Sequence, residues 1–84
     1  MSLLNLEIIS PNGVLFKGEC YLATIPSIDG DLGIMHGHEA VIASLRAGKI
    51  DIFDSKESII KSFEVTSGFA EMEGADRLVV LLDS

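Results

Sequence analysis

The chain has 84 residues, a length that allows one small domain with one hydrophobic core and excludes a multidomain enzyme or a doubly wound nucleotide-binding fold. Of these residues, 48% are hydrophobic and 23% are charged, which indicates a folded chain rather than a disordered one. Thirteen acidic residues against six basic ones give a net charge of −7, which disfavours binding to nucleic acid or anionic lipid and favours a basic partner surface.

Turn residues divide the sequence into short segments. The first turn is at 10–13, where Pro11 presets φ and the step from Asn12 to Gly13 tolerates positive φ. Further turn signals lie at 27–30, 47–48, 54–57, 67–68 and 73–76. The segments between the turns are mostly four to ten residues long, and repeated short strands indicate a β-sandwich or a β-barrel.

The hydrophobic patterns within these segments also favour strands. Apolar and polar residues alternate at 4–8, 49–52 and 62–66, which is the period of a half-buried strand. Between 14 and 25 the alternation is weaker, but aromatic and β-branched residues there favour a strand. The apolar run at 78–82 does not alternate, so we expect a strand that is covered on both faces.

One segment, 39–46, fits two structures. Val41, Ile42 and Leu45 have helical spacing, and Gly48 is a possible helix stop. A short apolar run of this kind is also compatible with a strand. The pattern alone leaves helix and strand as alternatives here.

The single cysteine, Cys20, cannot form a disulfide within the chain, which suits a reducing compartment. It lies in an apolar segment, so we interpret it as a small core residue rather than a reactive thiolate. No basic leader opens the chain, and the longest apolar run, at 78–82, is far shorter than a membrane-spanning helix. We therefore expect no direct insertion into lipid, and any membrane association through another molecule.

Both histidines and three acids lie in the glycine-rich stretch 29–39. Asp29 and Asp31 match positions 1 and 3 of a helix–loop–helix calcium site, but Gly33 at position 5 and Ala40 at position 12 stand where further ligands are required. The stretch therefore does not predict a calcium site.

A metal site is the second chemical hypothesis for this stretch. Gly30, followed after five residues by His36-Gly37-His38, resembles the first part of a cupin motif. In a strand, the two imidazoles would share one face and could reach one metal ion. The glutamate and the third histidine of that motif are missing. A small cupin-like metal-binding β-barrel using His36 and His38 is kept as the alternative function.

The same stretch, with other segments in order, resembles the epsilon subunit of the rotary ATP synthase. The resemblance rests on Phe-Lys-Gly at 16–18, Gly-Asp-Leu-Gly-Ile at 30–34, Gly-His at 37–38, Ala-Gly-Lys-Ile at 47–50 and Ser-Gly-Phe-Ala-Glu at 67–71. No single motif is decisive, but their ordered combination over about residues 3–83 is specific. Asp31 replaces the family's usual glutamate, and His36 and Ala40 replace its usual prolines.

The resemblance implies a single domain over residues 1–84, an all-β fold of flattened ten-stranded sandwich or barrel type. It also implies that the segment 39–46, for which the pattern allows helix or strand, is a strand. The family commonly continues into a C-terminal helical hairpin, which is associated with inhibition and, in some members, with ATP binding. This chain stops at Ser84, so neither role is carried over, and whether Ser84 is a natural end stays open.

The resemblance further implies a non-catalytic rotor subunit in the central stalk of a proton-translocating ATP synthase. Such a subunit couples rotation of the gamma subunit to the membrane c-ring and meets the alpha/beta catalytic head only indirectly. It lies at the cytoplasmic face of a bacterial inner or plasma membrane and uses no cofactor or metal.

Residue by residue, the resemblance implies two interfaces. The first meets the loops of the c-ring, which carry an arginine, and its residues are Asp29, Gly30, Asp31 and Leu32. We expect the two acids to pair with that arginine and Leu32 to lie at the loop tip as the apolar contact. The second meets the gamma subunit, and its residues are Ser10, His38 and Ala43.

Overall fold

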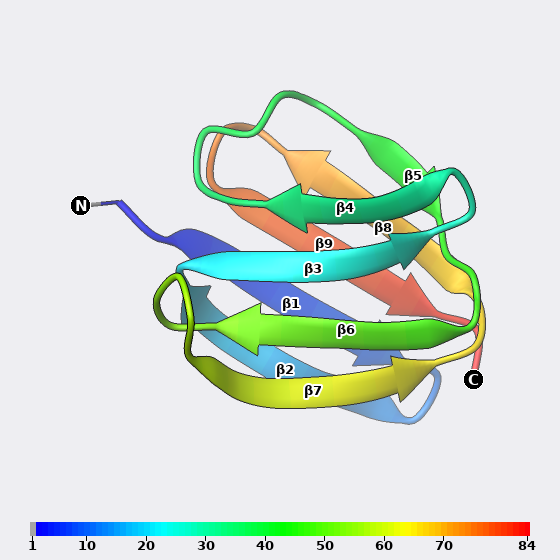
Figure 1. The fold of residues 1–84 in the computed structure, drawn as a ribbon. Helices are drawn as coiled ribbons and strands as arrows, with labels where there is room; N and C mark the ends of the chain where they lie inside the picture. The colour runs from blue at the N-terminus through cyan, green and yellow to red at the C-terminus, as the bar shows by residue number, and fades with distance from the viewer. Residues whose placement is uncertain (1) are drawn as a thin grey trace.

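The computed structural model describes residues 2–84, and over these residues the fold is all-β. Nine strands form two sheets that pack face to face (Figure 1). The strands are β1 (Leu4–Ser10), β2 (Gly13–Cys20), β3 (Leu22–Ser27), β4 (Gly30–Ile34), β5 (Ile42–Ser44), β6 (Gly48–Phe53), β7 (Ile59–Val65), β8 (Gly68–Glu73) and β9 (Arg77–Leu82). Among these residues, no helix is long and apolar enough to cross a bilayer.

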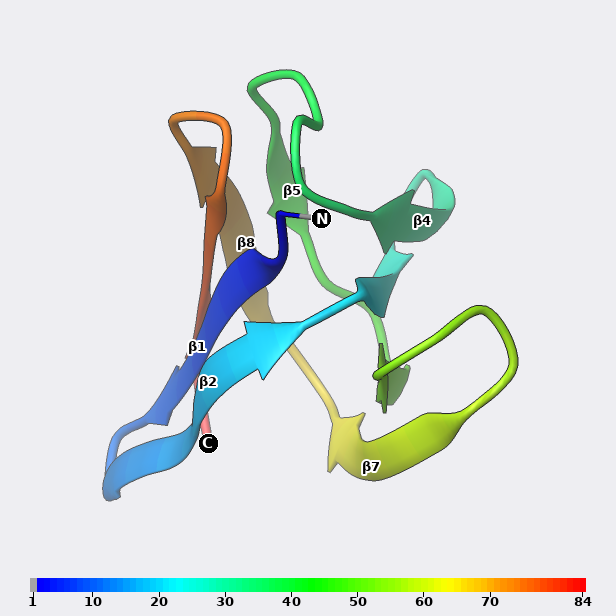
Figure 2. The ribbon, with the colours of Figure 1, turned by 90° about the vertical axis from the view of Figure 1, so that its left-hand side faces the viewer.

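The two sheets differ in their strand order. The five-stranded sheet has the order β2-β1-β9-β8-β5, and the four-stranded sheet has the order β4-β3-β6-β7. Strands β1 and β9 pair in parallel, and all other paired strands are antiparallel. Figure 2 views the two sheets edge-on and shows the space between them, which side chains fill.

The core lies between the sheets and is built by alternation along each strand, as in other β-sandwiches. Side chains of every second residue point inward and are almost fully buried; the largest are Leu4, Leu6, Ile8, Ile25, Ile34, Ile50, Ile52, Leu78 and Val80. At one edge, Phe16 of β2 and Phe63 of β7 close the core with an edge-to-face contact at 6.4 Å between ring centroids. The strands expected from alternation at 4–8, 49–52 and 62–66 are therefore confirmed.

Strand β9 corrects one expectation from the sequence. The run at 78–82 was expected to be covered on both faces, yet Leu81 is 51% exposed and Val79 is only partly buried. The run is a central strand between β1 and β8, but residues 2–84 cover only the inner face of its sheet. Its apolar outer face is therefore a surface of the molecule.

The segment 39–46, for which the pattern allowed helix or strand, contains the short strand β5. Ser44 pairs with Phe69 in the five-stranded sheet, whereas Leu45 makes an isolated bridge to Ser27 of the other sheet. The chain thus passes from one sheet to the other between two consecutive residues. One bridge pair is too short to form a strand, and residues 2–84 have nine strands where ten were expected.

Candidate functional site

The β3–β4 hairpin carries the residues expected to meet the c-ring. Its strands are joined by two residues, Ile28 and Asp29, between the pair Ser27 and Gly30. The Asp29 amide donates a hydrogen bond to Ser27 Oγ (3.1 Å), and the Ile28 amide donates to the carbonyl of Ser44 (2.9 Å). Gly30 has φ of +123°, a region that favours glycine. The tight turn therefore projects Ile28 and Asp29 from one end of the sandwich (Figure 1).

Leu32 does not lie at the tip of this hairpin, as was expected. It pairs with Ile25 inside β4 and packs, partly buried, against the hydrophobic core. The apolar side chain at the tip is Ile28, which is 62% exposed. Ile28 was not among the predicted contact residues, because the rest of the turn at 27–30 is polar or glycine. An isoleucine inside a tight turn was the available signal, since β-branched residues are uncommon there.

Asp31 has a partner within the chain that the sequence analysis did not find. Its carboxylate forms an exposed ion pair with the guanidinium of Arg46. Arg46 Nε also donates a hydrogen bond to the carbonyl of Ser27 (3.1 Å), which fixes the arginine beside the hairpin. An exposed pair of this kind contributes at most about 1 kcal/mol. An external arginine could therefore share or take over the Asp31 carboxylate at small cost.

The three residues expected to meet the gamma subunit are not gathered at one point. Ser10 ends β1, and its hydroxyl donates to the carbonyl of Gly13 (3.1 Å) in the β1–β2 turn. His38 belongs to the β4–β5 loop, where its Nδ1 lies 2.8 Å from the carbonyl of Glu39. That turn and that loop lie at opposite ends of the sandwich (Figure 1). A surface that includes both must run along the length of the molecule.

Ala43 lies between these ends, on β5, but its side chain points into the core and is only 8% exposed. Its neighbours Ile42 and Ser44 point to the outer face, and Ile42 is 72% exposed. A partner that binds at β5 would therefore contact the side chains of Ile42 and Ser44 rather than that of Ala43.

The two histidines do not have the geometry that the cupin-like alternative requires. They lie in the β4–β5 loop, with His36 in a turn and His38 after it, and not on one face of a strand. The loop is held by the Gly37 amide, which donates to the carbonyl of Ala75 (2.6 Å). Within residues 2–84, no three histidine, cysteine, aspartate or glutamate side chains gather at one point. The expectation that i and i+2 positions would share a face was wrong here.

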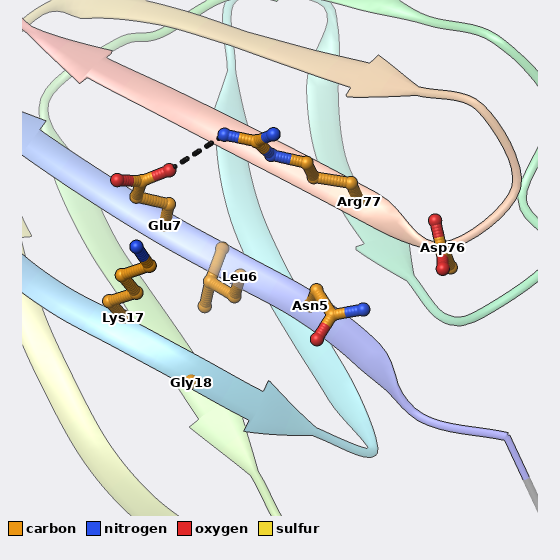
Figure 3. Close-up of a pocket in the computed structure, with 7 residues that line it drawn as sticks. All are labelled: Asn5, Leu6, Glu7, Lys17, Gly18, Asp76 and Arg77. Atoms are coloured by element: carbon orange, nitrogen blue, oxygen red, sulfur yellow. Dashed lines mark hydrogen bonds and ion pairs between the residues drawn. The ribbon is translucent and has the colours of Figure 1, made fainter.

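A depression of about 420 Å³ lies on the outer face of the five-stranded sheet, near the β8–β9 turn (Figure 3). Its charged lining residues are Glu7, Lys17, Asp76 and Arg77. The Arg77 guanidinium lies 2.9 Å from the Glu7 carboxylate and 3.7 Å from that of Glu73. Two acids against two bases leave the lining without net charge, so the depression does not select an ionic ligand.

Cys20 is buried at the end of β2, as expected for a small core residue. Burial, which disfavours the charged thiolate, raises the pKa of the Cys20 thiol to about 11, although a backbone hydrogen bond with Leu22 opposes the change. The group is therefore a neutral thiol at physiological pH and a poor nucleophile.

This raised pKa predicts a loss of stability at alkaline pH. Above the ordinary thiol pKa of 9.0 the unfolded chain ionises at Cys20, whereas the folded chain does so only near 11. The free energy of unfolding should therefore fall by up to about 1.4 kcal/mol per pH unit between these values. Urea unfolding of the wild type and of Cys20→Ala at pH 7.5 and 10.5 measures this fall. The contributions of groups that titrate in both proteins cancel when the two pH-dependent changes are subtracted. Equal losses in the two proteins would contradict the prediction.

The family described as "ATP synthase, Delta/Epsilon chain, beta-sandwich domain" matches residues 3–84. The chain belongs to this family. The resemblance found in the sequence is thereby confirmed over almost the whole chain, and the two packed sheets are its β-sandwich domain.

Several relatives of this sandwich are bacterial proteins named ATP synthase epsilon chain. The one from Sulfurimonas denitrificans is 35% identical over 83 residues, which are 99% of this chain and 62% of the relative. The one from Parvibaculum lavamentivorans is 38% identical over 77 residues, which are 92% of this chain and 58% of the relative. The chain thus spans about three fifths of the length of these relatives.

Solved structures share the fold of this epsilon-type sandwich at low sequence identity. A chain of the Euglena gracilis mitochondrial ATP synthase, in a structure of its OSCP, F1 and c-ring, superposes with a TM-score of 0.88 at 15% identity. That match covers all of this chain and 52% of the other. A chain from the central stalk and c-ring of the Tetrahymena thermophila enzyme gives a TM-score of 0.80 at 15% identity, covering 96% and 63%.

Proposed function

We propose that this protein is a non-catalytic central-stalk subunit of a proton-translocating ATP synthase. The observation that carries the proposal is the family match over residues 3–84, together with relatives named ATP synthase epsilon chain. In this role the sandwich, as one domain over residues 1–84, joins the gamma subunit to the c-ring and meets the alpha/beta head only indirectly. It works at the cytoplasmic face of a bacterial membrane, held there by the complex.

The β3–β4 hairpin supports the c-ring part of this proposal. It projects an exposed apolar side chain, Ile28, beside the carboxylates of Asp29 and Asp31 at one end of the molecule. Asp29 has no ion-pair partner among residues 2–84, and Asp31 is held only by the exposed pair with Arg46. Carboxylates presented in this way can orient an arginine of a partner loop. We assign the c-ring contact to Ile28, Asp29, Gly30 and Asp31, with Leu32 supporting them from the core.

The gamma contact is proposed along the five-stranded sheet, from Ser10 in the β1–β2 turn to His38 in the β4–β5 loop. Strand β5 lies on this route, and Ile42 and Ser44 present its outer face beside the buried Ala43.

Binding to the enzyme itself tests the proposed function. ATP synthase is purified from the organism that encodes the chain, and its endogenous copy of the subunit is removed. We expect the tagged chain to rebind at one copy per complex and to contact the gamma subunit in cross-linking followed by mass spectrometry. Absence of saturable binding to the depleted enzyme would reject the proposal.

A further inference from the structure

The segment 44–48, in which the chain crosses between the sheets, runs beside the turn of the β3–β4 hairpin (Figure 1). The Ile28 amide donates a hydrogen bond to the carbonyl of Ser44, and the Arg46 amide donates one to the carbonyl of Pro26, both at 2.9 Å. These two bonds fix the backbone of the hairpin against the segment. They do not fix the carboxylate of Asp31, whose side chain is 71% exposed. The orientation of that carboxylate therefore depends on side-chain contacts.

The Arg46 side chain supplies these contacts and joins both strands of the hairpin. Its Nε donates to the carbonyl of Ser27 on β3 (3.1 Å), and its Nη2 donates to Oδ1 of Asp31 on β4. Its Nη1 donates to the carbonyl of Ala47 (3.3 Å), within the crossing segment itself. A guanidinium is planar and its N–H donors point in fixed directions. Arg46 therefore holds the Asp31 carboxylate from a frame of backbone carbonyls.

Gly48, the first residue of β6, leaves the space that this arrangement needs. A Cβ built at Gly48 would lie 3.5 Å from Nη1 of Arg46 and 2.9 Å from the Cβ of Pro26. The guanidinium thus lies beside β6 as well as beside the two strands of the hairpin. Its position is restricted from three sides.

Stability does not account for the ion pair between Arg46 and Asp31, because exposed pairs contribute little to it. The main physical effect of a charge-assisted bond from an arginine is orientation of the carboxylate. Only Oδ1 of Asp31 is engaged, and Oδ2 accepts no hydrogen bond from residues 2–84. The carboxylate is held in place with one acceptor oxygen free. A side chain that is ordered before binding does not pay that entropy on binding.

We propose that Arg46 is a positioning residue, which holds Asp31 so that its free oxygen, Oδ2, meets a cationic side chain of the partner. This inference rests on the proposed function, which places the β3–β4 hairpin at the c-ring. The charge of Arg46 has the opposite effect, because a cation beside Asp31 reduces its attraction for a cationic partner group. Orientation and charge therefore predict opposite results when Arg46 is replaced.

The test uses two replacements of Arg46 and one control. Arg46→Lys keeps the charge but lacks the planar fork that bonds the Ser27 carbonyl and Asp31 together. Arg46→Gln also removes the charge, and Lys56→Gln, at an exposed position between β6 and β7, is the control for a lost charge. Each variant is titrated against the ATP synthase depleted of its endogenous copy, and its thermal midpoint is recorded to verify folding. We expect Kd to rise about threefold to tenfold for both Arg46 variants and to stay within about twofold for Lys56→Gln.

A double-mutant cycle tests whether Arg46 acts through Asp31. Asp31→Ala removes the carboxylate and is expected to weaken binding by itself. In the Asp31→Ala background, Arg46→Lys should change Kd by less than about twofold, because no carboxylate remains to be positioned. A merely structural role of Arg46 would persist in that background, so the cycle separates the two roles.

Four results would overturn the inference and leave the proposed function standing. The first is a wild-type Kd for both folded Arg46 variants. The second is tighter binding of Arg46→Gln together with a wild-type Kd for Arg46→Lys, which would show that only the charge matters. The third is an equal effect of Arg46→Lys with and without the Asp31 carboxylate, and the fourth is a wild-type Kd for Asp31→Ala. Failure of the wild-type chain to bind would reject both the inference and the proposed function.

Discussion

Gly68→Ala is expected to lower the free energy of unfolding by about 3 kcal/mol or more, which is a large part of the stability of a domain of this size. Gly68 begins β8 with φ of +147° and is buried. A Cβ built at this position would lie 2.2 Å from the carbonyl oxygen of Leu81, which is backbone and cannot rotate away. The carbonyl of Gly68 accepts a hydrogen bond from the Leu45 amide (2.9 Å). A shift of the Gly68 backbone would therefore also disturb the segment in which the chain crosses between the sheets.

Urea unfolding of the wild type and of Gly68→Ala measures the loss of stability, and Gly18→Ala is the control. A Cβ at Gly18 would meet only the Phe16 ring, at an ordinary contact distance of 3.6 Å. We expect Gly18→Ala to change the stability by less than about 1 kcal/mol, because its backbone is extended and alanine fits there. Equal losses for the two substitutions would show that the clash at Gly68 is relieved by an easy backbone shift.

Reversing the charge of the hairpin acids should weaken association with the synthase at least tenfold, or about 1.4 kcal/mol. The double variant Asp29→Lys with Asp31→Lys places cations where the proposed partner loop has an arginine, so attraction becomes repulsion. It also removes the ion pair between Asp31 and Arg46. That loss should cost under about 1 kcal/mol of stability, because the pair is exposed. Reconstituted enzyme with this variant should also show reduced ATP-driven proton pumping.

The matched control reverses two acids at the other end of the sandwich, Asp54→Lys with Glu57→Lys. Both lie in the β6–β7 turn, opposite the β3–β4 hairpin in Figure 1, and both are exposed. The two double variants change the net charge by the same amount, from −7 to −3, since each replacement adds two charges. Equal affinity and pumping for both variants would contradict a specific role of the hairpin acids.

Most strands could be predicted because the alternation of apolar and polar residues is a local property. Leu4, Leu6 and Ile8 are buried, as their spacing predicts. The segment around Ala43 could not be decided in this way. A three-residue strand is too short to establish a period, and the chain leaves one sheet for the other directly after Ser44.

The candidate site was predicted only in part. The sequence placed Asp29 and Asp31 in one turn-rich stretch, and they do share one hairpin. It could not show that Leu32 packs against the core and that Ile28 is exposed, because this depends on the register of β3 with β4. Arg46 lies fifteen residues from Asp31, so their pairing arises only when β5 and the hairpin fold together.

The sequence by itself determined the all-β class, the inward residues of the alternating strands and, through ordered motifs, the family. These features depend on residues that are near each other along the chain, where period and turn chemistry act directly. Only the tertiary structure decided that the apolar run at 78–82 has an exposed outer face and that Leu81 aligns with Ile9 and Phe69. The reason is physical: a strand's own sequence does not specify its neighbours, and strand pairing sets which side chains share a surface.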